Sequence, residues 1–200
     1  MPTERTLSTA EHRRTIVVSS AIATFARHGF RGTRIADVAQ HAGISPAYVS
    51  KLFSSKERLF VAALDLCYTR IVEALERGAR QAEDPSPTGL LLGMGGAYAR
   101  LIEDRDLMML QVHAQASTDR PAVAEAVRRG IGRVTDYVVA RSGAGATDIQ
   151  YFMAFGQLCH LLTSVDAFSV DEKWADVLTD SLRHSKAAHR ARLAAEQETA

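Results

Sequence analysis

The chain has 200 residues, of which 46% are hydrophobic and 24% charged, with a formal net charge of +1. This composition is typical of a soluble globular protein, and the length is enough to bury a core as one domain or two small ones. No apolar run approaches the ~20 residues that a membrane span needs, and the N-terminal segment lacks the apolar stretch of a signal peptide, so we expect a cytoplasmic protein.

The first predicted helix covers residues 9 to 28. A capping box formed by Ser8 and Glu11 marks its start. Apolar residues recur along it with helical spacing, and Gly29 is suited to its end.

Residues 33 to 60 then have the layout of a helix-turn-helix, with two short helices, a tight turn and a third helix. In the turn, Gly43 can adopt the left-handed conformation that a Cβ penalises, and Ile44 fills the space between the two helices. Ser45 can cap the second helix, and Pro46 fits its first position, where the missing N–H costs nothing. We interpret this second helix as the recognition helix, which would enter the major groove of DNA.

A capping box of Ser54 and Glu57 opens the next helix, which runs without a breaker to about residue 79. A helix of this length spans roughly 35 Å, which is enough to connect a small head to the rest of the chain. The predicted organisation is a DNA-binding domain at 9–60 with its motif at about 34–53, a connecting helix at about 54–79, and a ligand-binding and dimerisation domain at 61–200.

The segment 83–89 is the clearest break in the chain, because it holds two prolines and a glycine. Beyond it, apolar spacing predicts five more helices, separated in one place by a loop at 142–147. These helices are expected at 88–104, 106–117, 121–141, 148–166 and 172–196. The sequence therefore predicts an all-α protein of about nine helices, with a three-helix head joined by a long helix to a helical body.

Charge is distributed unevenly between these parts. Residues 1–60 carry nine Arg or Lys against four Asp or Glu, a balance of +5, whereas the remainder carries 15 against 19, a balance of −4. A basic head on an acidic body favours binding of the head to nucleic acid.

Six residues of the head are candidates for DNA contacts from their positions alone. N-terminal side chains of a recognition helix enter the major groove, and the first turn of the following helix favours a phosphate. The candidates are Thr33, Ser45, Ala47, Tyr48, Lys51 and Lys56. Thr33 can also serve only as a helix cap, and Lys56 can also be a solvated surface residue. Arg5, Arg13 and Arg14 either reach flanking DNA or form a solvated arm, which is the simpler interpretation.

Residues of the body that combine aromatic rings, thioethers and polar tips are candidates for the wall of a ligand pocket. They are Met94, Tyr98, Met108, Met109, His113, Tyr137, Tyr151, Phe152 and Phe155. Each can also be an ordinary core residue. Three glycines in one helical stretch, Gly93, Gly95 and Gly96, each cost about 1 kcal/mol in a helix, which indicates a close helix contact, a kink or a hinge.

The last two predicted helices carry an apolar stripe that could pair with a second copy of the chain. Its residues are Leu158, Leu161, Leu162, Trp174, Val177, Leu178 and Leu182. The alternative is that the stripe closes the core of a single chain.

Nothing in the sequence predicts catalysis or a bound cofactor. There is no nucleophile–base–acid set, phosphate loop or metal-ligand spacing, so we expect no enzyme activity, no cofactor and no metal site. Cys67 and Cys159 are far apart in the sequence and are expected to be buried without a disulfide.

Several short motifs together resemble the tetracycline-repressor (TetR) family of bacterial regulators. They are Gly29-Phe30 before a Thr, I-A-D-V-A, A-G-I-S, L-F and S-K-E-R-L-F, spread over about residues 10–60. The resemblance implies a head that binds an operator as a homodimer, two last helices that form a four-helix dimer interface, and a body pocket whose small-molecule ligand lowers DNA affinity.

Two positions depart from the family pattern. The family usually has an aromatic residue where this chain has Ser50 and a small residue where it has Tyr48. Either Tyr48 supplies the usual phosphate contact from a different position, or its ring stacks on a sugar or a thymine methyl instead. Arg34 stands where a hydroxyl residue is common, which would add a phosphate contact beside Thr33.

The expected function is therefore a ligand-responsive repressor, bacterial, cytoplasmic and associated with the nucleoid, that binds a palindromic double-stranded operator as a homodimer. Its effector is expected to be apolar or aromatic. The alternative is an architectural protein that binds DNA without sequence preference.

Overall fold

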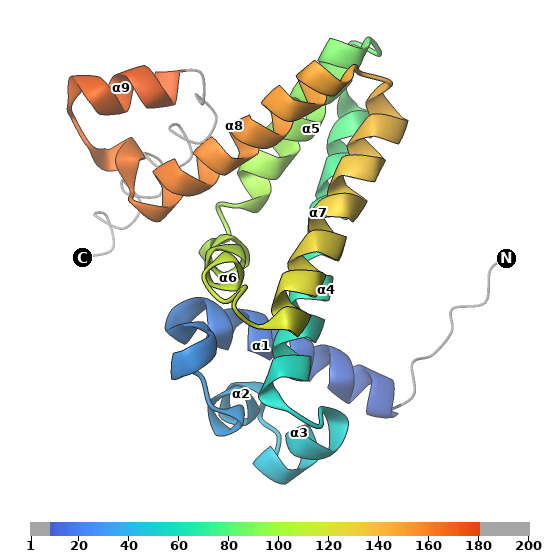
Figure 1. The fold of residues 1–200 in the computed structure, drawn as a ribbon, viewed down its shortest axis with the longest axis vertical. Helices are drawn as coiled ribbons and strands as arrows, with labels where there is room; N and C mark the ends of the chain where they lie inside the picture. Colours follow the sequence, from blue (N-terminus) through green and yellow to red (C-terminus); the bar gives the residue numbers. More distant parts are fainter. Residues whose placement is uncertain (1–8, 181–200) are drawn as a thin grey trace, which may run out of the picture. The chain divides into compact units, whose positions relative to one another are not determined.

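The computed structural model describes residues 9–180 of the chain. Within that range it contains nine α-helices and one short 3₁₀ helix, with no strand (Figure 1). The elements are α1 (Thr9–Gly32), α2 (Ile35–Ala42), α3 (Pro46–Leu52), α4 (Lys56–Gln81), α5 (Pro87–Leu101), α6 (Arg105–Gln115), α7 (Pro121–Ser142), α8 (Ala146–Ser164), η1 (Ala167–Ser169) and α9 (Lys173–Thr179). The prediction of an all-α fold with about nine helices is confirmed.

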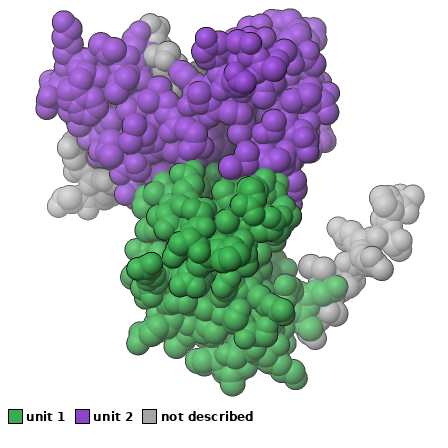
Figure 2. Space-filling model, in the orientation of Figure 1, with its two compact units in different colours: residues 1–68, 109–130 green, residues 69–108, 131–200 purple. Residues whose placement is uncertain are grey.

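Two compact units divide the chain, as Figure 2 shows. Unit 1 comprises residues 1–68 and 109–130, and unit 2 comprises residues 69–108 and 131–200. Unit 1 thus contains α1, α2, α3 and the first half of α4, together with the second half of α6 and the start of α7. A functional division at residue 60 stays a prediction.

Three phenylalanines form the centre of unit 1. The rings of Phe25 and Phe60 meet edge to face with their centroids 4.7 Å apart, and those of Phe30 and Phe60 do so at 5.3 Å. All three side chains are buried. Because α1 supplies two of these rings and α4 the third, the cluster holds the start of α4 against α1.

Helix α1 bends at Gly29 and ends later than predicted. Gly29 has a φ of 65°, a conformation that favours glycine, and helical residues resume after it up to Gly32. The imidazole of His113 lies beside this bend, with its Nε2 atom 3.1 Å from the carbonyl oxygen of Ala26. The segment 109–130 is thereby attached to α1.

In unit 2, α4 and α5 cross at a pair of glycines. A Cβ placed on Gly93 would lie 2.7 Å from the carbonyl oxygen of Gly78, and a Cβ placed on Gly78 would overlap the carbonyl oxygen of Gly93. No side chain fits between the two backbones. Glycine lowers the stability of a helix, and the direct backbone contact between α4 and α5 offsets that cost at these two positions.

Helices α5 and α8 lie side by side in unit 2 (Figure 1). Tyr98 of α5 and His160 of α8 join them through a hydrogen bond between the phenol oxygen and Nε2, with the two rings stacked and their centroids 5.8 Å apart. His160 is only 4% exposed. This pair is a polar contact between the two helices.

Several predicted helix boundaries were displaced by a few residues. The cap of α4 is Ser55, whose hydroxyl oxygen accepts the amide of Arg58 at 3.1 Å, and not Ser54. The loop before α8 is confined to residues 143–145, where 142–147 was predicted. The predicted Ser8 cap and the part of the last helix that contains Leu182 lie outside the described residues.

The described residues also bear on membrane spans, metal sites and disulfides. In residues 9–180 no helix is long and apolar enough to cross a membrane. No group of three His, Cys, Asp or Glu side chains in that range is placed to hold a metal ion. Cys67 and Cys159 are both buried and form no disulfide, as predicted.

Candidate nucleic-acid interface

The turn between α2 and α3 has the geometry that the sequence predicts. Gly43 is left-handed, with φ of 65° and ψ of 30°, and its amide donates back to the carbonyl oxygen of Gln40 at 3.2 Å. Ser45 caps α3 by accepting the Tyr48 amide at 3.3 Å, and Pro46 occupies the first helical position. The helix-turn-helix is therefore formed by local signals that reinforce one another.

Helix α3 has one buried side and one exposed side. Val49 is fully buried where α2 and α3 pack together, and α2 buries Val38 and Ala39. The predicted contact residues lie on other sides of the helix. Ser45, Ala47 and Lys51 are exposed, and Tyr48 is half-buried. Ser50, which the family pattern assigns to an aromatic residue, is also exposed.

Two arginines of α1 contact α3. The guanidinium carbon of Arg13 lies 5.4 Å from the centre of the Tyr48 ring, and that of Arg14 lies 4.3 Å from the centre of the Phe53 ring. Arg14 also donates from Nη1 to the carbonyl oxygen of Leu52 at 3.4 Å. Both arginines are exposed, as a solvated arm requires, but they belong to α1 and contact the α3 segment, so they do not form an arm. Arg5 lies outside the described residues.

The structure also contradicts the prediction that Thr33 caps the first helix of the motif. The residue in the cap position of α2 is Arg34, and the Thr33 hydroxyl instead donates to the carbonyl oxygen of Gly29 at 2.8 Å. Its side chain is fully buried, and its hydroxyl group satisfies a backbone acceptor at the bend of α1. A hydroxyl in this position is out of reach of a phosphate.

Arg34 is exposed but already has an acidic partner. Its Nη2 atom donates to Oδ1 of Asp37 at 2.8 Å, and its backbone amide donates to Oδ2 of the same carboxylate at 2.8 Å. These hydrogen bonds hold the pKa of the Asp37 carboxyl below its ordinary value. A phosphate bound by Arg34 would have to compete with Asp37 for the guanidinium.

Lys56 stands in the first turn of α4, as predicted, but its ammonium group is partly engaged inside unit 1. Nζ donates to the carbonyl oxygen of Thr33 at 2.8 Å and lies 4.7 Å from the centre of the Phe30 ring. The side chain is half-buried. Lys56 thus ties the start of α2 to α4, and any phosphate contact would add to this role.

The predicted pocket residues are divided between the two units. Met109 and His113 belong to unit 1, and the other seven belong to unit 2. Met94 and Met108 are fully buried, whereas Tyr151 is 72% exposed. His113 is hydrogen-bonded to the Ala26 carbonyl. The assignment of these nine residues to the wall of one ligand pocket stays a prediction.

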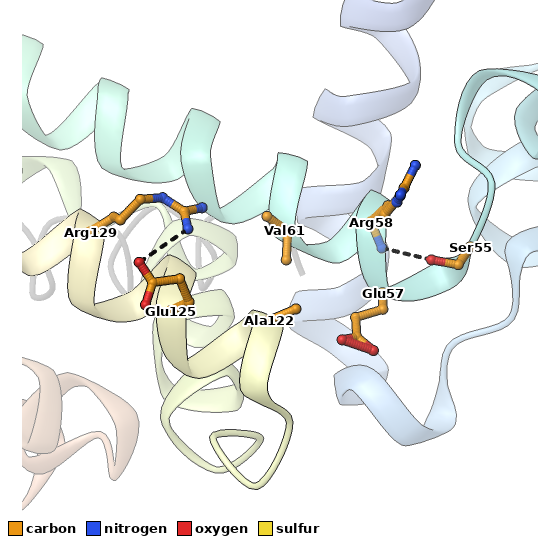
Figure 3. Close-up of a pocket in the computed structure, with 7 residues that line it drawn as sticks. All are labelled: Ser55, Glu57, Arg58, Val61, Ala122, Glu125 and Arg129. Carbon is orange, nitrogen blue, oxygen red and sulfur yellow. Dashed lines mark hydrogen bonds and ion pairs between the residues drawn. The ribbon is translucent and has the colours of Figure 1, made fainter.

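A cavity of about 460 Å³ lies elsewhere, in unit 1, between the start of α4 and the start of α7 (Figure 3). Its lining combines acids and bases, and none of it was predicted from the sequence. The lining residues are Ser55, Glu57, Arg58, Val61, Ala122, Glu125 and Arg129. In Figure 3 the Arg129 guanidinium faces the Glu125 carboxylate, and the two are 3.7 Å apart.

The predicted apolar stripe is partly exposed. Leu161, Trp174, Val177 and Leu178 are exposed, and Leu158 is half-buried. Tyr151, Phe155 and Val165 of the same helices or their junction are exposed as well. Leu162 is an exception, because it is 1% exposed and belongs to the core of unit 2, so its assignment to an interface is wrong.

Residues 17–63 match the family model described as "Bacterial regulatory proteins, tetR family". Over 48 residues the chain is 42% identical to the HTH-type transcriptional regulator RutR of Escherichia coli (strain K12), a match that covers 24% of this chain and 23% of RutR. The sequence similarity to this relative thus spans less than a quarter of its length.

Solved structures match over most of the chain. A TetR-family transcriptional regulator from Agrobacterium tumefaciens is similar with a TM-score of 0.67 and 16% identity, covering 90% of this chain and 98% of that one. The regulator FadR from Bacillus subtilis, solved in complex with stearoyl-CoA, is similar with a TM-score of 0.65 and 12% identity, covering 84% and 95%. At these identities the likeness concerns the fold.

Proposed function

We propose that the chain is a transcriptional regulator of the TetR family whose helix α3 reads an operator in double-stranded DNA, because residues 17–63 match the model of that family. The observation that carries this proposal is the division of α3 into a buried side, with Val49, and an exposed side, with Ala47 and Lys51. A helix held in this way by its neighbour can enter a major groove without losing its packing. The role is binding and not catalysis.

We further propose that the protein is a homodimeric repressor in the bacterial cytoplasm, released from DNA by a small molecule bound in its body. A two-fold operator requires two heads, and the exposed stripe of α8 and α9 offers an apolar surface for a second copy. One solved structure with the same fold contains an acyl-CoA, which supports an effector with an apolar part. The effector can act only if it binds the DNA-bound and released arrangements with different affinity.

The direct test is a selection of random duplex DNA by the purified protein at about 150 mM salt, where non-specific phosphate binding is weak. We expect an inverted repeat to be recovered. Recovery of DNA with no common sequence would contradict the proposal and favour an architectural protein.

Replacing Tyr48 by alanine is expected to lower the ratio of operator to random-duplex affinity roughly tenfold, because a lost base contact costs about 1–3 kcal/mol. Lys56→Ala is the comparison: it should weaken both DNAs alike and reduce the salt slope by about one. It should also lower the Tm, since Nζ bonds the Thr33 carbonyl. Fluorescence anisotropy at several salt concentrations measures the DNA affinities, and thermal unfolding measures the Tm. Equal losses on both DNAs for Tyr48→Ala would exclude it from base reading.

Replacing Leu161 by glutamate is expected to convert the dimer to a monomer, because it places a charge in the proposed interface. Leu92→Glu is a matched control, since Leu92 is also an exposed leucine of unit 2 but lies on α5. Sedimentation at micromolar concentration distinguishes the outcomes. A Leu161→Glu protein that remains dimeric would place the interface elsewhere.

A further inference from the structure

Consecutive arginines of α1 contact the two ends of the recognition helix. Arg13 stacks over Tyr48, in the first turn of α3, and Arg14 stacks over Phe53 and donates to the carbonyl of Leu52 at the helix end. The two contacts differ in kind. Phe53 is 3% exposed and belongs to the core, whereas Tyr48 stands on an accessible side of α3.

The contact made by Arg14 is structural. The carbonyl groups at the end of a helix lack intrahelical partners and carry a partial negative charge, so a guanidinium at Leu52 stabilises the helix end. Stacking on Phe53 fixes the same side chain from a second direction. Arg14 therefore links the C-terminal end of α3 to α1.

We propose that Arg13 is a positioning residue that determines sequence specificity by holding the ring of Tyr48. This inference rests on the proposed role of α3 in DNA recognition. A guanidinium stacked on a tyrosine face restricts the side chain to the arrangement in which the contact exists. The same ring would then meet the same base pair each time the protein binds.

The surroundings of Tyr48 explain why Arg13 is needed. A cleft of about 290 Å³ lies beside the ring, lined by Arg13, Gly43, Ile44, Ser45 and Tyr48. Even a Cβ added to Gly43 would meet no atom within 4 Å. The cleft leaves space beside the ring, and the Arg13 guanidinium, which stacks on it, is a contact that can restrain it.

This arrangement also gives a physical reason for the departure of Tyr48 from the family pattern. The chain carries its tyrosine at a position where α1 supplies a planar cation, and it carries the small Ser50 at the usual aromatic position. Arg13 and Tyr48 are thus a matched pair. Replacing Tyr48 should remove all that Arg13 contributes to discrimination, whereas replacing Arg13 should remove only the part of the Tyr48 contribution that depends on a restrained ring.

The test compares affinities for the selected operator and for a random duplex of equal length. Arg13→Ala should lower the ratio of the two affinities about two- to fivefold, which is the range of an exposed cation–π contact. Arg13→Lys should retain the affinity for the random duplex, because the charge is kept, but lower the ratio about as much as Arg13→Ala does, because the planar group is lost.

Arg27→Ala is the matched control for the loss of one charge. Arg27 is exposed on the same helix, and its side chain has no hydrogen bond, ion pair or ring contact within the described part of the chain. Its replacement should leave the affinity ratio unchanged. If Arg13→Ala also leaves the ratio unchanged, or if Arg13→Lys restores it fully, Arg13 acts as a charge alone and the inference is wrong.

A double-mutant cycle shows whether Arg13 acts through Tyr48. In a Tyr48→Ala background, Arg13→Ala should cause no further loss of discrimination. A full additional loss would mean that Arg13 reads DNA independently. A wild-type protein with no preferred sequence contradicts the proposed function itself, whereas a wild-type protein with a clear operator and an unaffected Arg13 variant contradicts only this inference.

Discussion

Replacing Gly78 by alanine is expected to destabilise the protein by about 3 kcal/mol, the upper part of the range for overpacked sites. The added Cβ would overlap the carbonyl oxygen of Gly93, which is a backbone atom that cannot move without displacing α5. The change is informative because alanine normally stabilises a helix relative to glycine by about 1 kcal/mol. Urea unfolding measures the difference, and the Tm should fall by about 6–12 °C.

Gly132→Ala is the matched control for this prediction. Gly132 lies inside α7, and a Cβ built on it meets no atom within 4 Å, so the same substitution should there raise stability by about 0.5–1 kcal/mol. Gly93→Ala should behave like Gly78→Ala, since its Cβ would lie 2.7 Å from the opposite carbonyl oxygen. If Gly78→Ala and Gly132→Ala change stability in the same direction, the two helices are not held by direct backbone contact.

The glycines show one limit of prediction from this sequence. Helical spacing indicated that Gly93, Gly95 and Gly96 have a reason to be in a helix, and contact, kink and hinge were equally open. The structure assigns a close contact to Gly93 alone, because alanine side chains at Gly95 and Gly96 would meet their nearest neighbours only at 3.7 and 3.6 Å. Its partner Gly78 lies 15 positions earlier, and no local pattern connects the two.

The helix-turn-helix could be predicted closely because its signals are local. Gly43, Ser45 and Pro46 each fix the conformation of their own neighbours, so reading them in order gives the turn and the start of α3. The roles of Thr33 and Lys56 were harder to predict. Their residue types suit a phosphate, but the fold brings them together, and the Lys56 ammonium bonds the Thr33 carbonyl.

The proposed pocket and the contacts of α1 required knowledge of the tertiary fold. The sequence could not show that residues 109–130 belong to the same compact unit as the head, and this division separates His113 from most of the residues with which it was grouped. Likewise, nothing in the spacing of Arg13 and Arg14 reveals that the fold places Tyr48 and Phe53 beneath them. Contacts between segments far apart in the chain therefore could not be predicted from the sequence alone.

His160, which no motif singled out, is expected to make the stability of the protein depend on pH. Burial lowers the pKa of its imidazole to about 4, from 6.5 for an exposed histidine. Between these two values the unfolded chain binds a proton that the folded chain excludes, so stability falls as the pH drops from about 6.5 toward 4. At pH 5 this group alone should remove about 2 kcal/mol relative to pH 7.5.

The His160→Gln variant isolates this effect. Glutamine stays neutral over the whole range and can still form a hydrogen bond with Tyr98, so the free energy of unfolding should fall about 2 kcal/mol less between pH 7.5 and 5 than in the wild type. His41→Gln, on the exposed face of α2, controls for the replacement of a histidine by glutamine. Parallel curves for the wild type and His160→Gln would mean that the buried imidazole accepts its proton in the folded state as readily as in the unfolded chain. His160 Nδ1, which is buried without a hydrogen-bond partner, would then have to find an acceptor once protonated.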